Sequence, residues 1–199
     1  AIDLYSTRVQ EKYPHLDLRV GLTKGKGVYN FQMGGPESWD ALGDPVNYAA
    51  RLDGVSMIFG EYMVVSAEDA QGLVQEDPKL KHRLLPLDVF TVKGRENEST
   101  IGHAVLPENS DYLSYVPRFK KIFKTYTSAF EKYRGSSQTI CKFRAEPTGR
   151  GKDGFECLQA ALEQIFDLEN ELHSKGLALL PAYEMLKNRL QSYILTPHY

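Results

Sequence analysis

Hydrophobic positions in the first part of the chain alternate with polar ones, which is typical of strands. The alternation begins at 18–22, a Gly-Lys-Gly turn follows at 25–27, and a second apolar run occupies 28–33. These runs and the turn between them predict a β-hairpin. Residues 1–13 have the spacing of an amphipathic helix without a cap at its front, so we expect the chain to be a fragment that begins partway through an element.

A helix start follows at Gly43. Asp44 can cap this helix and Pro45 suits its first turn, and the pattern extends to about Leu52. The small residues that we expect to face the sheet are Val46, Ala49 and Ala50.

Further strands follow this helix. An apolar run at 62–65 predicts a strand, and Ser66 followed by Asp69 three residues later resembles a capping box for a short helix. Apolar runs at 87–92 and 100–106, joined by a polar turn, predict two more strands. The pattern is that of an α+β structure rather than a strict repeat of strand and helix.

The pattern changes to helical after Pro107. Apolar stripes at helical spacing predict helices over 117–133, 155–173 and 181–194. We therefore divide the chain into an α+β part, 1–107, and a helical extension, 108–199. The stripes are expected to pack on one another or on the sheet, and the binding of a partner protein is the alternative.

Composition excludes several classes of function. The chain has 199 residues and a net charge of −2, from 24 Lys and Arg against 26 Asp and Glu, which provides no overall field to attract nucleic acid. No apolar run approaches the roughly 18 residues that a membrane-spanning helix needs. The two cysteines and five histidines form no metal-binding motif, and the default is a reducing, cytoplasmic compartment.

Polar side chains gather near the start of the predicted helix. Asn47 and Arg51 stand four residues apart, so they share one side of a helix, one turn from each other. Asp40 precedes them on an extended segment and would hold a carboxylate near the same end. On spacing alone, Asn47 and Arg51 could also simply face water.

Three ordered segments resemble the signatures of the class III nucleotidyl cyclase catalytic domain. They are 20–25 (VGLTKG), 42–52 (LGDPVNYAARL) and 92–95 (VKGR), and the family forms are VGIHTG, GDxVNxAxRL and VKGK. The resemblance covers about residues 18 to 106, roughly half of the chain. It implies a ferredoxin-like βαββαβ core, and a dimer in which two such domains pair head to tail with the active site at their interface.

The resemblance also implies a reaction. In this family the ribose 3′-hydroxyl of a nucleoside triphosphate attacks its own α-phosphate, which releases pyrophosphate and leaves a 3′,5′-cyclic monophosphate. By position, Arg51 resembles the arginine that stabilises the α-phosphate in the transition state, and Asn47 resembles the asparagine that orients the ribose. Lys93 resembles the lysine that binds the terminal phosphates.

Asp40 falls on the position that reads the base. A carboxylate there can accept a hydrogen bond from the exocyclic amine of adenine, whereas guanine offers a carbonyl oxygen at that point. ATP is therefore the expected substrate rather than GTP.

The family's metal-binding aspartates come from strands that precede 18–22, and the chain does not include them. We therefore expect the ligands of Mg²⁺ or Mn²⁺ in the missing N-terminal part, and assign no metal ligand here. By itself this segment is expected to be inactive. Asn30 and the segment 34–38 also depart from the family's usual glycine pattern.

The sequence thus predicts the C-terminal portion of an adenylate cyclase catalytic domain, with a partial ferredoxin-like core and a helical extension. It would pair with a second copy or with another cyclase domain, and the intact enzyme would convert ATP to cyclic AMP for intracellular signalling. The alternatives are a degenerate cyclase-like domain with a regulatory or partner-binding role, and a helical region that serves chiefly as a docking module.

Overall fold

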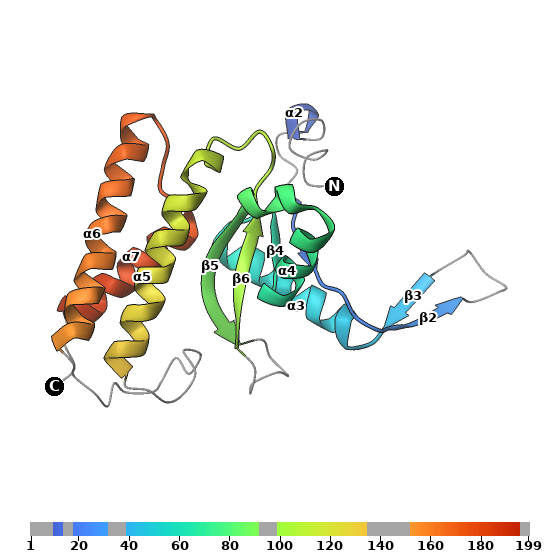
Figure 1. The fold of residues 1–199 in the computed structure, drawn as a ribbon. Helices are drawn as coiled ribbons and strands as arrows, with labels where there is room; N and C mark the ends of the chain where they lie inside the picture. The colour runs from blue at the N-terminus through green and yellow to red at the C-terminus, as the bar shows by residue number, and fades with distance from the viewer. Residues whose placement is uncertain (1–9, 14–17, 32–38, 92–98, 135–151, 196–199) are drawn as a thin grey trace.

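The computed structural model describes residues 10–13, 18–31, 39–91, 99–134 and 152–195 (Figure 1). In chain order the elements are α2 (Gln10–Lys12), β1 (Val20–Leu22), β2 (Val28–Phe31), β3 (Trp39–Leu42), α3 (Asp44–Phe59), β4 (Met63–Val65), α4 (Ala67–Glu76), the 3₁₀ helix η2 (Pro78–His82), β5 (Leu84–Thr91), β6 (Ser99–Val105), the 3₁₀ helix η3 (Leu113–Tyr115), α5 (Val116–Arg134), α6 (Lys152–Ser174) and α7 (Pro181–Leu195). Most of the helix expected over 1–13 lies outside the described residues.

The chain is α+β, and its main sheet is mixed. Four strands lie in the order β1-β4-β6-β5, in which β1 and β4 are parallel and the other neighbours are antiparallel. The strands β2 and β3 form a separate antiparallel pair, which projects from the rest of the molecule in Figure 1. The prediction that β5 and β6 are two adjacent strands joined by a polar turn is confirmed as far as the described residues extend.

The predicted hairpin between 18–22 and 28–33 is wrong. Val20 pairs with Met63 of β4, and Val28 pairs with Leu42 of β3. Local alternation and a glycine turn indicate that two strands exist, but they do not say which strand each one pairs with. Here β1 packs against α3, and that contact places it beside the strand that follows α3.

Side chains alternate between the two faces of the main sheet. Val64 of β4 and Ala104 of β6 belong to a large hydrophobic cluster, whereas their neighbours Val65 and Val105 belong to a smaller one. Because successive side chains of a strand point to opposite faces, the two clusters lie on opposite faces of the sheet. The large cluster includes α3 and α5–α7, and the smaller one includes α4 and η2.

The helical extension packs both on itself and on the sheet, as its stripes predict. The helices α5 and α6 lie side by side in Figure 1, and α5 and α7 both contact β5. One continuous cluster of buried residues runs from the sheet through α5, α6 and α7, so the extension shares its core with the sheet. No helix among the described residues is both long enough and apolar enough to cross a membrane.

The helix α3 is longer than predicted and begins differently. Gly43 is its N-cap residue and no side chain caps it, so the prediction that Asp44 is the cap is wrong. The helix continues past Leu52 to Phe59 and ends at Gly60, whose φ of 67° is left-handed. Both Leu52 and Phe59 are buried, which continues the apolar stripe beyond the expected end.

The predicted cap of α4 is confirmed. The Ser66 hydroxyl oxygen accepts a hydrogen bond from the Asp69 backbone N–H at 3.0 Å. The Ser66 hydroxyl also donates to the Asp69 carboxylate at 2.7 Å. The second carboxylate oxygen of Asp69 accepts from the backbone N–H of Lys24, so this cap also fastens the end of β1 to α4.

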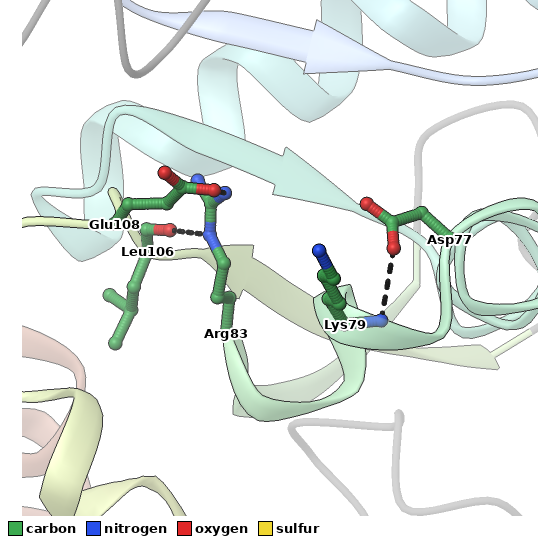
Figure 2. A network of polar contacts seen from close by, with 5 residues as sticks. All are labelled: Asp77, Lys79, Arg83, Leu106 and Glu108. Atoms are coloured by element: carbon green, nitrogen blue, oxygen red, sulfur yellow. Dashed lines mark hydrogen bonds and ion pairs between the residues drawn. The ribbon is translucent and has the colours of Figure 1, made fainter.

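Arg83, just before β5, contacts the chain where it leaves β6 for the helical extension. Its Nε donates to the Leu106 carbonyl at 2.7 Å and its guanidinium pairs with the exposed Glu108 at 3.3 Å, as Figure 2 shows. Its backbone carbonyl in turn accepts from the Leu106 N–H. In the same view, Asp77 caps η2 by accepting from the backbone N–H of Lys79. Buried Arg83 thus fixes the exit of the chain from β6.

Gly21 explains how closely β1 and α3 approach each other. A Cβ atom at this position would overlap the backbone oxygen of Ala49 and the backbone nitrogen of Asp53. The close approach of the α3 backbone therefore requires a glycine at this position of β1.

We expect Gly21→Ala to lower the free energy of unfolding by about 3 kcal/mol, because the added methyl group meets backbone rather than a mobile side chain. Urea denaturation measures the loss. The control is Gly54→Ala, where the added Cβ meets no described atom within 4 Å apart from its chain neighbours and the backbone of its own helix. Gly54 is inside α3, so alanine there should stabilise the protein by up to about 1 kcal/mol. Equal losses in both variants would contradict this explanation.

Candidate functional site

The first turns of α3 carry the two residues that the spacing singles out. Asn47 is exposed and Arg51 is half-buried, and both lie on the side of α3 that turns away from the core. Their amide and guanidinium groups are thus one turn apart on an accessible surface. The side chain of Arg51 supplies a fixed positive charge with a planar set of donors, which suits contact with a phosphate group.

Apolar side chains are also exposed along α3. The exposed fractions are 40% for Val46, 60% for Met57 and 58% for Ile58, and Leu42 just before the helix is 62% exposed. An apolar surface that borders polar functional groups is typical of an interaction site.

The prediction that Val46 and Ala50 face the sheet is wrong. Both are exposed, and Ala49 is only half-buried. The buried stripe is instead formed by Tyr48 and Leu52, because these larger side chains fill the space between α3 and the sheet.

The other two predicted site residues are only partly or not at all described. Asp40 lies on β3, where its backbone pairs with Asn30, and β3 leads directly into α3. Its side chain is outside the described part of the structure. Lys93 lies in the segment 92–98 between β5 and β6, which is also outside the described residues. Of the four predicted residues, the described structure therefore brings Asn47 and Arg51 together.

A cavity of about 600 Å³ opens where β1 and β4 end, on the buried side of α3. Its described wall is rich in hydroxyl groups, from Thr23, Tyr48, Ser66, Ser99 and Thr100. Lys24, Glu68 and Asp69 also line it. This wall can form hydrogen bonds with a polar solute, but the two carboxylates oppose the binding of an anion.

Among the described residues, no group of three or more His, Cys, Asp or Glu side chains is placed to hold a metal ion.

Sequence reasoning missed a buried ion pair between the sheet and α7. The Arg189 guanidinium lies 2.7 Å from the Asp88 carboxylate and donates to the Tyr126 hydroxyl at 2.9 Å. Burial raises the pKa of Asp88 even though Arg189 lowers it, and burial raises the pKa of Tyr126 to about 12. A signal was present, because Asp88 interrupts an otherwise apolar strand. Its partner Arg189 lies 101 residues further along the chain, and the sequence around Asp88 does not indicate it.

Asp88 lies in a β-bulge of β5. The register of β5 against β6 shifts between Pro86 and Val89, so that two residues of β5 oppose one of β6. The backbone N–H of Val89 donates to Asp88 at 2.8 Å, which holds the carboxylate in place.

No protein-family model, curated protein or solved structure matches the chain. The likeness to nucleotidyl cyclases therefore rests on the three ordered motifs and on the residues that they contain.

Proposed function

We propose that the chain belongs to an adenylate cyclase of class III and supplies Asn47 and Arg51 to an active site that converts ATP to 3′,5′-cyclic AMP and pyrophosphate. The observation that carries the proposal is the position of these two side chains, one turn apart on the outer side of α3. A polar pair on a convex helix surface can enclose a nucleotide only if a second surface covers it.

The exposed apolar residues along α3 support such a covering surface. Val46, Met57 and Ile58 would be buried if a second cyclase domain packed against α3. We therefore propose a homodimer, or a pairing with another cyclase domain, with the nucleotide between the two. The finer fold that belongs to this proposal is a partial ferredoxin-like cyclase core, in which β1 would receive a further strand from the N-terminal part.

The packing of the motifs is consistent with this proposal. Gly21 of the first motif and Ala49 of the second meet at the closest approach of β1 and α3. The two motifs thus support one piece of local structure, in which β1 fixes the position of the helix that carries Arg51. That relation gives a physical reason for the glycine at position 21.

Each side chain would have a definite task in the reaction. The 3′-hydroxyl oxygen forms a bond to the α-phosphorus and loses its proton, while the bond from the α-phosphorus to the pyrophosphate oxygen breaks. Arg51 would stabilise the charge on the α-phosphate oxygens and Asn47 would orient the ribose. Lys93 would hold the terminal phosphates, and Asp40 would accept a hydrogen bond from the adenine amine. Bound Mg²⁺ or Mn²⁺, with ligands in the N-terminal part, would supply further charge stabilisation.

The test is the conversion of ATP by the complete enzyme, which joins this chain to the metal-binding part of the domain. With Mg²⁺ or Mn²⁺ present, cyclic AMP and pyrophosphate should form in equal amounts, and GTP should be a poor substrate. The proposed setting is the cytoplasm, where ATP is abundant. A complete, folded and dimeric domain that leaves ATP unchanged would favour the degenerate, regulatory alternative.

A further inference from the structure

Glu61 is a buried carboxyl group at the end of α3. It follows Gly60, and its backbone N–H donates to the Ser56 carbonyl at 3.0 Å, as part of the helix terminus. The residue is 8% exposed, and its buried Oε1 atom has no hydrogen-bond partner among the described residues. A buried oxygen without a partner is unfavourable for a carboxylic acid and far more so for a carboxylate.

No positively charged side chain of the described residues acts on Glu61. Tyr112, from the segment before η3, and Tyr183 of α7 both interact electrostatically with it. The Tyr112 hydroxyl donates to the Ala178 carbonyl at 2.9 Å, and the Tyr183 hydroxyl lies 2.9 Å from the Pro86 carbonyl. Both hydroxyl protons are thus engaged elsewhere.

Two carboxylates act on these tyrosines, and one of them, Asp88, is paired with Arg189. Asp111 acts on Tyr112, and Asp88 acts on Tyr183. Burial raises the pKa of Glu61 to about 8. At neutral pH the carboxyl group therefore keeps its proton in the folded protein.

Glu61 also lies at the junction between the α+β part and the helical extension. A Cβ atom on Gly60 would lie 3.1 Å from the side chain of Pro181, the first residue of α7. Tyr112 and Tyr183 come from the other side of the junction. The buried carboxyl group therefore lies where the end of α3 meets the start of α7, and two tyrosines of the helical extension interact with it electrostatically.

We propose that Glu61 is a proton-dependent latch. While its carboxyl group is protonated, α7 and the segment before α5 stay closed on the end of α3, and loss of the proton opens this junction to water. The reason is that a carboxylate at this place would be buried without a partner, and opening is the way for it to gain hydration. The proposal does not depend on cyclase activity.

The direction of the pH effect follows from proton linkage. The folded protein binds the proton of Glu61 up to about pH 8, whereas the opened chain releases it near the ordinary value of 4.5. The stabilisation is complete below pH 4.5 and is lost as the pH rises toward 8. Within that window, the equilibrium constant for opening should rise up to tenfold per pH unit, and above it the constant should level off.

The first experiment compares the pH dependence of urea denaturation in the wild type and in Glu61→Gln. Glutamine has the shape of the protonated acid but does not titrate, so the two proteins should have similar stability at pH 5. Between pH 5 and 7.5 the unfolding constant of the wild type should rise relative to that of Glu61→Gln by roughly tenfold per unit. The matched control is Glu163→Gln on α6, an exposed glutamate, which should follow the wild type. A constant ratio between the wild type and Glu61→Gln would overturn the proposal.

The second experiment measures the opening itself. The backbone N–H groups of Tyr183 and Glu184 donate to the Leu180 carbonyl in the first turn of α7 and report on the junction by hydrogen exchange. Relative to Glu61→Gln at the same pH, their exchange in the wild type should accelerate from pH 5 to 7.5, while exchange in β5 changes less. Uniform acceleration over the whole chain would show a general loss of stability and would overturn the latch.

A direct titration keeps the proposal testable if the variant does not fold. The carboxyl carbon of Glu61 in the wild type, followed by ¹³C NMR, should titrate near pH 8. A midpoint below pH 6 would overturn the proposal.

Discussion

Arg51→Ala should lower the turnover of ATP by the complete enzyme roughly 10²- to 10³-fold, the scale expected when one donor to the transition state is lost. The KM for ATP should change little, because the guanidinium would act mainly on charge that develops at the α-phosphate. Steady-state kinetics with quantified cyclic AMP measure both constants. An unchanged turnover number would remove Arg51 from the proposed catalytic role.

Two further variants separate geometry from charge. Arg51→Lys keeps the positive charge but loses the planar set of donors, so we expect it to recover only part of the lost rate. Lys121→Ala removes a positive charge from an exposed position on α5, far along the chain from the candidate site, and should leave the turnover unchanged. If Lys121→Ala lowered the rate as much as Arg51→Ala, the effect would reflect the net charge of the protein.

Local chemistry allowed much of the fold to be predicted. The helices α5, α6 and α7 were predicted from apolar residues that recur about one helical turn apart. Their observed bounds differ little from the expected ones. The cap at Ser66 depends on Asp69 only three residues later. Such features are determined by residues that are close in sequence, so the sequence reports them well.

Features that depend on distant partners could not be predicted. The pairing of β1 with β4 joins Val20 to Met63, and nothing near Val20 indicates this choice over a hairpin. The burial of Glu61 is likewise a feature of the folded chain, in which Tyr112 and Tyr183 of the helical extension interact with it electrostatically. A glutamate that follows a helix-ending glycine usually faces water, so the sequence context predicted an exposed side chain.

In the candidate site too, features set by nearby residues could be predicted and features set by distant residues could not. A spacing of four residues was sufficient to place Asn47 and Arg51 on one side of α3. The sequence did not indicate which side of the helix would be buried, because Val46 and Ala50 are as apolar as many core residues. Tyr48 and Leu52 take the buried positions because the gap between α3 and the sheet requires their volume. The exposure of apolar side chains along α3 became visible only with the fold.

Arg189→Met should lower the free energy of unfolding by about 3 kcal/mol, because it leaves the Asp88 carboxylate buried without a positively charged partner. The Asp88 side chain is only 7% exposed and that of Arg189 is 21% exposed, so water cannot replace the lost charge. The variant also removes the donor to the Tyr126 hydroxyl. Urea denaturation at pH 7 measures the loss, and Arg118→Met is the control. The ion pair of Arg118 with Glu171 is 38% and 41% exposed, and its loss should lower the stability by less than about 1 kcal/mol.

The pH dependence and a double variant identify the cause. Burial raises the pKa of Asp88, so the folded protein can take up a proton there more readily than the unfolded chain, and stability falls as the pH rises above 3.8. Without Arg189 this dependence should steepen, so the loss in Arg189→Met should be smaller at pH 4 than at pH 7. Combining Arg189→Met with Asp88→Leu replaces the ion pair by apolar contacts and should restore most of the stability, because the desolvation of both charges is then avoided. A double variant as unstable as the sum of the single ones would mean that Asp88 and Arg189 act independently, and that the bulge in β5 does not serve to bring them together.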